Sequence, residues 1–185
     1  MRVIAGRLGG RRLSAPRGRT TRPTSDRVRE ALFSMLGSID AASVLDLFAG
    51  TGALGIEALS RGAATALFVE RDASAVAVLK GNLALLELTE PHARVRTGEA
   101  LAALRSARRA GETYDLVFVD PPYDRLRDSE RELSALLPTV LAPGARVVVE
   151  SDRRALAELP LAVAQRKRYG DTTITIHCTE DKDER

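Results

Sequence analysis

Short apolar runs and longer mixed segments alternate along the chain. The runs at 43–48, 65–69 and 114–119 have the length and composition of buried strands. The segments between them predict helices, and Gly37 and Gly62 close two of these. Strands that alternate with helices predict an α/β fold, in which right-handed crossovers join a doubly wound, mostly parallel sheet.

The same alternation extends over most of the chain. Strands are expected at 43–48, 65–69, 93–97, 114–119, 145–150, 162–169 and 172–178. Helices are expected from a cap at Thr24 or Ser25 to Gly37, and at 53–61, 72–86, 101–109, 129–137 and 153–159. Gly170-Asp171 joins the last two strands, which predicts a C-terminal antiparallel hairpin, and the charged end 180–185 is expected to fray.

The composition is typical of one globular domain with a short appendage. The chain has 185 residues, 44% of them hydrophobic, which is enough for a substantial core. It has no apolar run of about 18 residues, no secretory signal at its N-terminus and one cysteine, Cys178. We therefore expect a monomer in the reducing cytoplasm with no membrane partner. His92 and His177 stand apart, so no metal is expected.

Positive charge is concentrated near the N-terminus. Residues 1–29 hold nine arginines and one acid, a net charge of +8, whereas the remainder has a net charge of −5. This asymmetry indicates a polyanionic partner, because arginine suits phosphates. Interleaved apolar residues predict a small hairpin that turns at Gly9-Gly10, and a solvated, disordered tail is the alternative. We assign an arm to 1–23 and the domain to 24–185, with candidate polyanion contacts at Arg2, Arg7, Arg11, Arg12, Arg17, Arg19 and Arg22.

A glycine loop follows the first predicted strand. Gly50-Thr51-Gly52-Ala53-Leu54-Gly55 matches the pattern G-x-G-x-x-G, and Glu70 lies 20 residues after Gly50, at the end of the next strand. Glycines let the backbone approach a ligand at a helix N-terminus, and the acid can accept both hydroxyl groups of a ribose. The arrangement predicts a nucleoside-containing cofactor, against the alternative of a tight turn without a ligand.

Two classes of cofactor fit such a loop, a dinucleotide such as NAD and S-adenosylmethionine. Asp46 favours the second, because a carboxylate inside an apolar strand is costly unless paired, and S-adenosylmethionine carries a cationic amino-acid group. The chain also leaves no room for the separate substrate domain of a dehydrogenase. Glu99 and Ala100 follow the third strand, where Glu99 could contact adenine or serve only as an acid in the first turn of a helix.

A second motif, Asp120-Pro121-Pro122-Tyr123, comes directly after the apolar run 114–119. A carboxylate, two rigid prolines and an aromatic ring suit a planar base with an exocyclic amine. The oxygens can accept hydrogen bonds from the amine while the ring stacks on the base. The alternative is a rigid turn without a ligand. Together with the glycine loop, the motif predicts methyl transfer to such an amine.

These motifs resemble those of a known family. Residues 44–52, Val-Leu-Asp-Leu-Phe-Ala-Gly-Thr-Gly, are similar to motif I of class I S-adenosylmethionine-dependent methyltransferases, and 120–123 to motif IV of those that methylate exocyclic amines. Nearly the whole chain resembles the RsmD family, the bacterial 16S rRNA guanine-N2 methyltransferases. The matching pieces are Arg2-Val3-Ile4-Ala5-Gly6, Gly10-Arg11-Arg12-Leu13, Arg22-Pro23-Thr24 with the first helix, and Tyr169-Gly170-Asp171-Thr172.

The resemblance implies a seven-stranded Rossmann-like sheet with S-adenosylmethionine over the carboxyl ends of its first and fourth strands. The arm would bind 16S rRNA, within a small ribosomal subunit or an assembly intermediate. The reaction would methylate N2 of one guanine, which stacks on Tyr123 while Asp120 and the Pro121 carbonyl accept its amine hydrogens. Many class I enzymes have Asp where this chain has Glu99. The implied cofactor contacts are Asp46, Phe48, Ala49, Gly50, Thr51, Gly52, Glu70, Arg71, Glu99 and Ala100.

Two other functions remain open. An adenine-N6 methyltransferase acting on DNA or RNA has the same Asp-Pro-Pro-Tyr motif, but it usually needs a target-recognition domain for which 185 residues leave no room. A nucleic-acid-binding module with a vestigial nucleotide fold would need neither Glu70 nor Asp120, and both are present. The arm and the first helix, rather than the catalytic motif, therefore carry the choice of guanine.

Overall fold

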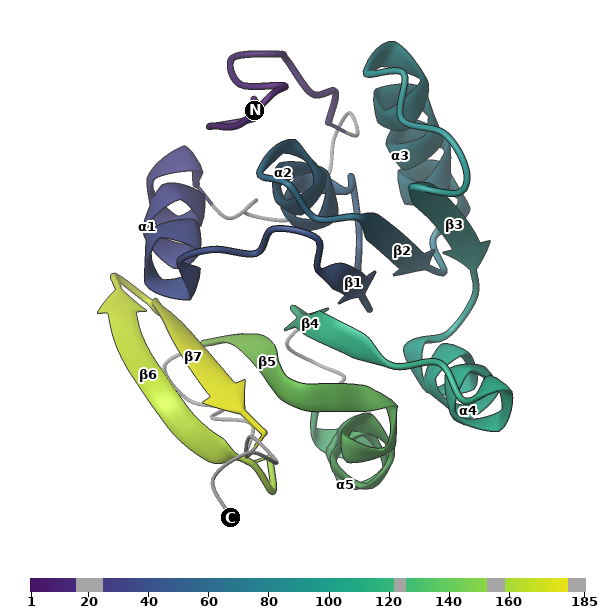
Figure 1. Cartoon of the computed structure of the whole chain (residues 1–185), viewed down its shortest axis with the longest axis vertical. Helices are drawn as coiled ribbons and strands as arrows, with labels where there is room; N and C mark the ends of the chain where they lie inside the picture. Colours follow the sequence, from purple (N-terminus) through teal and green to yellow (C-terminus); the bar gives the residue numbers. More distant parts are fainter. Residues whose placement is uncertain (16–24, 122–125, 153–158, 180–185) are drawn as a thin grey trace.

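The computed structural model describes residues 1–15, 25–121, 126–152 and 159–179. A seven-stranded sheet in the order β3-β2-β1-β4-β5-β7-β6 forms its centre, and helices cover both faces (Figure 1). The first five strands of the chain run parallel, and β7 pairs antiparallel with both β5 and β6. The predicted doubly wound α/β fold with a C-terminal hairpin is confirmed.

Most helices and strands begin and end close to the predicted positions. The strands are β1 (Ser43–Asp46), β2 (Thr65–Glu70), β3 (Ala93–Thr97), β4 (Tyr114–Val119), β5 (Leu141–Asp152), β6 (Ala162–Tyr169) and β7 (Thr172–Cys178). The helices are α1 (Asp26–Leu36), α2 (Ala53–Ser60), α3 (Ala73–Leu85), α4 (Ala100–Ala110) and α5 (Leu126–Leu136), followed by a 3-10 helix, η1 (Leu137–Val140).

Strand β5 is longer than the sequence pattern predicts. We expected it to start at Ala145, after the turn formers at 143–144, but it begins at Leu141. Tyr114 of β4 pairs with Leu141 and Leu116 pairs with Arg146, so the residues of β5 between these two pairs form a β-bulge and β5 stays in the sheet. Most of the helix expected at 153–159 and all of the expected fray at 180–185 lie outside the described residues.

The two faces of the sheet carry separate hydrophobic cores. Helices α1, α2 and α3 cover one face, and α4 and α5 cover the other (Figure 1). Successive side chains alternate between the faces: Phe118 and Val148 belong to the first core, and Val117 and Val147 to the second. A strand buried on both faces shows no polar alternation, which is why 114–119 is almost continuously apolar.

The arm folds back on itself within its described part, residues 1–15. An antiparallel bridge pairs Arg2 with Arg12, and the chain turns between them at 7–10. Val3, Leu8 and Leu13 are at most 5% exposed and belong to the same core as α1, α2 and α3. The described arm is therefore a packed part of the domain.

Buried polar groups at the end of α2 hold the arm in place. The Glu57 carboxylate accepts hydrogen bonds from the amides of Ile4 at 2.7 Å and Ala5 at 3.0 Å. The Ser60 hydroxyl accepts a hydrogen bond from the amide of Leu8 at 3.0 Å and donates one to the carbonyl oxygen of Ala5 at 2.5 Å. Because buried polar groups are costly without partners, these bonds fix the position of the arm on α2.

Not every arginine near the N-terminus faces solvent. Arg29 in α1 is fully buried, and its Nη2 donates to the Asp26 carboxylate at 2.9 Å and to the carbonyl oxygen of Arg2. Burial lowers the pKa of this guanidinium, against the opposing effects of Asp26 and Glu57. One of the nine arginines within 1–29 is therefore a structural residue that joins the arm to α1.

Gly6→Ala should destabilise the protein more than Gly10→Ala does. Both residues have a positive φ, +79° and +82°, so a side chain costs about 1–2 kcal/mol of backbone strain at either position. At Gly6 a Cβ atom would also lie 1.9 Å from the carbonyl oxygen of Ser60, whereas at Gly10 nothing lies within 4 Å. Urea unfolding measures both variants, and equal losses of stability would show that the arm does not pack against α2.

Candidate active site

The parallel strands bring four acidic residues to one edge of the sheet. Asp46 ends β1, Glu70 ends β2, Asp120 directly follows β4, and Glu150 lies near the end of β5. In open α/β sheets ligands bind at the carboxyl edge, where the strand order reverses. Here the reversal lies between β1 and β4, so the acidic residues surround the expected binding position.

The glycine loop between β1 and α2 is shaped partly by the protein's own packing. Gly52 is the N-cap of α2 in a left-handed conformation, and a Cβ there would lie 2.4 Å from Leu79. A Cβ on Gly55 would lie 2.3 Å from the ring of Phe68. Gly50 has a positive φ of +53°, but its Cβ would meet nothing nearer than 4.0 Å. Of the three motif glycines, Gly50 is the one that leaves room for a ligand.

Asp46 is 2% exposed and holds the start of α2. Its carboxylate accepts a hydrogen bond from the amide of Gly55 at 3.2 Å. Burial raises the pKa of Asp46 to about 7, and the charge of Glu70 adds to this, while hydrogen bonds from backbone amides oppose it. The group is therefore close to its titration midpoint at neutral pH, and a nearby cation would favour its ionised form.

Glu70 fastens the end of β2 to the glycine loop. Its Oε2 accepts a hydrogen bond from the amide of Gly50 at 2.9 Å, and its Oε1 accepts from the amides of Arg71 and Asp72 at 2.8 Å each. A carboxylate has about four lone-pair positions, and three of them are used by these amides, so Oε2 can accept one further hydrogen bond, for example from a ribose hydroxyl group. The pairing of loop and acid that their spacing indicated is a direct contact.

Glu99 and Arg71 form an ion pair at the same edge. Arg71 Nη1 lies 3.1 Å from Glu99 Oε1, and the two side chains are 37% and 65% exposed. Glu99 occupies the N-cap of α4 without a capping hydrogen bond, and Ala100 behind it is buried. Exposed pairs of this kind contribute little to stability, so both side chains remain available to a ligand.

Asp120 and Pro121 leave the end of β4 beside these acids. Asp120 is half-buried and Pro121 is buried. Burial raises the pKa of Asp120 well above that of a free carboxyl group, and the neighbouring charges of Glu150 and Asp46 raise it further. Residues 122–123 lie outside the described residues, so the stacking expected of the aromatic ring there stays a prediction.

Sequence reasoning does not single out Glu150. It follows the apolar run 147–149 of β5, and the register that pairs Val119 with Val149 places Glu150 beside Asp120. The available signal is an acid that directly follows an apolar run, as Glu70 and Asp120 do, but no motif surrounds Glu150. Glu150 adds a fourth carboxyl group to the edge.

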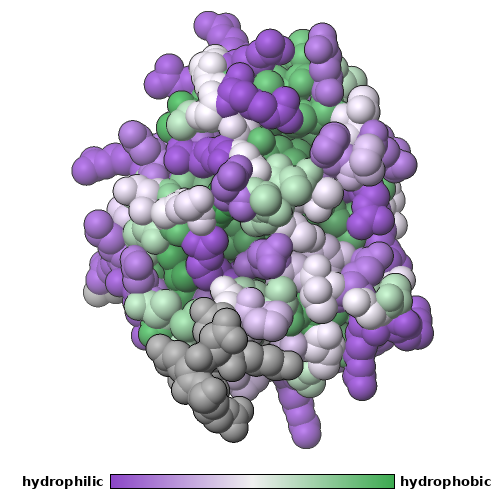
Figure 2. Space-filling view, in the orientation of Figure 1, coloured by the Kyte–Doolittle hydropathy of each residue, from purple (hydrophilic) through white to green (hydrophobic). Residues whose placement is uncertain are grey.

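The described arginines of the arm form an exposed cationic surface. Figure 2 shows hydrophilic side chains over the upper end of the molecule, where Figure 1 places the arm and α3. Arg2, Arg7, Arg11 and Arg12 are all exposed. The other candidate arginines fall within 16–24 and lie outside the described residues, so RNA binding by the arm stays a prediction.

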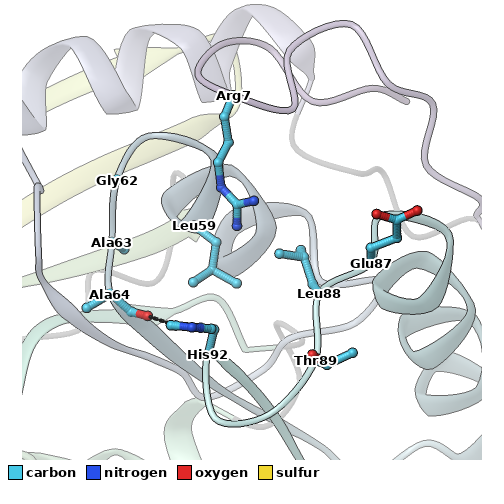
Figure 3. Close-up of a pocket in the computed structure, with 9 residues that line it drawn as sticks. All are labelled: Arg7, Leu59, Gly62, Ala63, Ala64, Glu87, Leu88, Thr89 and His92. Carbon is cyan, nitrogen blue, oxygen red and sulfur yellow. Dashed lines mark hydrogen bonds between the residues drawn. The ribbon is translucent and has the colours of Figure 1, made fainter.

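A hollow lies at the opposite edge of the sheet from the acidic residues (Figure 3). It has a volume of about 410 Å³, and the side chain of Arg7 reaches over Leu59 toward Leu88 and His92. The loops that line it lead into the amino ends of β2 and β3. Because the six residues of β2 span about 17 Å, this hollow is separate from the acidic edge.

The described part of the chain contains no group of three or more His, Cys, Asp or Glu residues that could hold a metal ion. No described helix is long and apolar enough to cross a membrane. Cys178 is a partly exposed thiol at the end of β7, on the last strand of the hairpin.

The ligand-free protein should lose stability between about pH 4 and pH 7 because of Asp46. The folded state holds this proton up to a pKa of about 7, whereas the unfolded chain releases it near 3.8, so rising pH favours unfolding across that range. The free energy of unfolding should fall by an amount of the order of 4 kcal/mol over this range. Asp46→Asn, which keeps an acceptor for the Gly55 amide, should remove this dependence on pH. Urea unfolding of both proteins at pH 5 and pH 8 measures this, and parallel pH dependences would contradict it.

Comparison with known proteins identifies the family. Residues 1–178 match the family model described as "Conserved hypothetical protein 95". The chain is 42% identical over 188 residues to "Putative rRNA methyltransferase YlbH" of Bacillus subtilis, covering 96% of this chain and 98% of that protein. It is 44% identical over 126 residues to "Ribosomal RNA small subunit methyltransferase D" of Escherichia coli, and the match covers 68% of this chain and 61% of that relative.

A solved structure is also similar to this chain. "Putative methyltransferase yhhF from Escherichia coli" superposes with a TM-score of 0.84 at 37% identity, over 98% of this chain and 99% of that one.

These matches include the arm as well as the sheet. The family model begins at residue 1, so it covers the N-terminal residues on which the resemblance to the RsmD family partly depends. The resemblance is confirmed, and the chain belongs to the family described as conserved hypothetical protein 95, the RsmD family.

Proposed function

We propose that this protein transfers a methyl group from S-adenosylmethionine to N2 of a guanine in small-subunit ribosomal RNA. The observation that carries the proposal is the meeting of two motifs at one edge of the sheet. The glycine loop is held there by Glu70, and Asp120-Pro121 ends β4, the strand next to β1. The names of the relatives from B. subtilis and E. coli, both rRNA methyltransferases, support it.

The residues at this edge fit S-adenosylmethionine better than a dinucleotide. Gly50 leaves space beside the loop, and Glu70 Oε2 can accept one further hydrogen bond, from a ribose hydroxyl group. Four carboxyl groups favour a cationic ligand and disfavour a pyrophosphate. When bound, S-adenosylmethionine supplies an electrophilic methyl group on a positively charged sulfur.

Further residues complete the proposed cofactor site. Phe48 is half-buried and Ala49 is buried, and both belong to the turn that follows β1. Arg71 and Glu99 would border the adenine at the ends of β2 and β3. We assign the cofactor contacts to Asp46, Phe48, Ala49, Gly50, Thr51, Gly52, Glu70, Arg71, Glu99 and Ala100.

Asp120 and Pro121 would hold the amine of the target base. The carboxylate and the carbonyl oxygen would accept hydrogen bonds from its two N–H groups. These acceptors would favour a pyramidal nitrogen, whose lone pair is no longer delocalised into the ring and can attack the methyl group, and they would offset the positive charge that develops on the nitrogen. Asp120 accepts best when ionised, yet burial and its acidic neighbours raise its pKa. A cationic cofactor would lower that pKa again, so cofactor binding prepares Asp120 for the amine.

The amine loses a proton after methyl transfer. Asp120 need not be a strong base, because the methylated amine is a strong acid while it carries the positive charge. A buried carboxyl group with a raised pKa can hold that proton, and Glu150 lies beside Asp120. The carboxyl pair is therefore a suitable first acceptor before the proton reaches solvent.

The cationic arm would bind RNA phosphates and position the RNA without reading its sequence. The described arm is packed against α2 before any RNA is present, so it offers its exposed arginines at fixed positions. We assign the enzyme to the cytoplasm as a monomer. Its substrate would be 16S rRNA in a small ribosomal subunit or an assembly intermediate.

Asp120→Ala should abolish methyl transfer while cofactor binding stays nearly intact. The loss in kcat should be about a hundredfold or more, because the variant no longer offers a carboxylate to the amine. A tritiated-methyl assay on naked rRNA, small subunits and DNA, followed by nucleoside analysis, measures activity and product. Asp115→Ala is the control, since Asp115 lies at the opposite end of β4 and bonds the Ser43 amide. Full activity of Asp120→Ala, or N6-methyladenosine as the product, would refute the proposal.

Replacing Arg11 and Arg12 by Ala should weaken RNA binding and flatten its salt dependence. Each lost phosphate contact should reduce the slope of log K against log salt by about 0.7–0.9. Replacing Arg108 and Arg109 removes the same charge from the end of α4, on the other face of the sheet, and should leave the slope closer to that of the wild type. Filter-binding titrations at several salt concentrations measure this. An unchanged slope in the arm variant would show that the arm does not contact the phosphates.

A further inference from the structure

Asn82 of α3 connects the arm to the glycine loop. Its side-chain oxygen accepts a hydrogen bond from the amide of Ser14 at 2.8 Å, and its Nδ2 donates to the carbonyl oxygens of Ser14 at 3.2 Å and Thr51 at 3.0 Å. The side chain is 1% exposed. All three bonds run to backbone groups of segments that are distant along the chain.

The bond to Thr51 completes the support of one peptide unit in the glycine loop. The carbonyl of Thr51 and the amide of Gly52 belong to the same peptide. The amide donates to the carbonyl oxygen of Ala49 at 2.7 Å, and the carbonyl accepts from Asn82 at 3.0 Å. With both ends bonded, this peptide cannot rotate, so the loop that approaches the cofactor is held in one conformation.

The two hydrogen bonds to Ser14 hold the N-terminal arm. Asn82 pairs with Ser14 through one donor and one acceptor, as a neighbouring strand would, and Leu13 before it bonds the carbonyl oxygen of Met1. Arg11 and Arg12, which are exposed, precede Ser14 by three and two residues. These arginines therefore lie close along the chain to a residue that Asn82 bonds to the glycine loop.

A simpler explanation is that Asn82 only satisfies buried backbone groups. The arm already has such anchors in Glu57 and Ser60, which bond its amides at the end of α2. Those anchors act on residues 4–8 and do not touch the glycine loop. Asn82 differs because one amide group bonds both segments, so a displacement of either one strains the other.

We propose that Asn82 is a positioning residue that couples cofactor binding to RNA binding. The coupling rests on the proposed function, because it requires that the arm binds RNA and the loop binds S-adenosylmethionine. A cofactor that contacts the loop further restrains Ser14 through the shared Asn82 amide, and RNA that holds the described arm further restrains the loop in the same way. Linkage makes the effect reciprocal, so each ligand raises affinity for the other by the same factor.

The first test measures cofactor affinity without RNA. Asn82→Ala should weaken S-adenosylmethionine binding about tenfold in calorimetric titration, the scale of one lost net hydrogen bond. Ser60→Ala is the matched control, since it also removes a buried side chain that bonds the arm but lies away from the loop. It should lower the unfolding temperature while leaving cofactor affinity unchanged. Equal losses of affinity in the two variants, or none in Asn82→Ala, would overturn the proposal.

The second test measures the coupling itself. The wild-type dissociation constant for protein-free 16S rRNA is compared with and without saturating S-adenosylhomocysteine, which permits no turnover. S-adenosylhomocysteine should lower the dissociation constant for RNA about fivefold or more in the wild type. This ratio of dissociation constants should fall close to one in Asn82→Ala and stay at the wild-type value in Ser60→Ala. A wild-type factor of one, or a wild-type factor retained in Asn82→Ala, would refute the coupling. If the wild type bound no RNA, the proposed function would fail, whereas the calorimetric titration would still decide the effect of Asn82 on the loop.

Discussion

Parallel strands end at a common edge, and in this protein four of those ends carry carboxyl groups that repel one another. Asp46 and Asp120 have raised pKa values, chiefly because burial disfavours the charged form, and the neighbouring acids raise them further. The ligand-free fold therefore has unfavourable electrostatic energy at this edge, which a cation can relieve. The proposed site depends on this constraint in two ways. It favours a positively charged cofactor over a pyrophosphate, and it links the ionisation of Asp120 to the presence of that cofactor.

The arm and the acidic edge are parts of one packed unit. The apolar residues of the arm complete the core beneath α1, α2 and α3, and buried polar groups bond its backbone at two places. One place is the end of α2, at the amino edge of the sheet, and the other is Asn82, beside the glycine loop. The described arm therefore bonds to the helices at two points, one near the amino edge of the sheet and one near its carboxyl edge.

The sequence pattern predicts the sheet, the glycine loop and three of the acids because each depends on a short local signal. Strands buried on both faces give apolar runs, and the spacing from Gly50 to Glu70 describes one strand–helix–strand unit. Glu150 has the same kind of signal but no motif around it. Asn82 has none, because its partner Ser14 is 68 positions away and an asparagine in a helix resembles a surface residue. Arg29 shows the limit of counting charge, since composition does not report burial.

The packing of the arm against Ser60 also bears on which parts of the arm can vary. The turn at Gly6 fits the end of α2 so closely that no side chain is accommodated there. A different arm would have to match Glu57, Ser60 and Asn82 to pack in the same place. The described arm therefore cannot be exchanged as a module without changes in α2 and α3. Its exposed arginines can be substituted without disturbing this packing, whereas its buried residues are constrained by the fold.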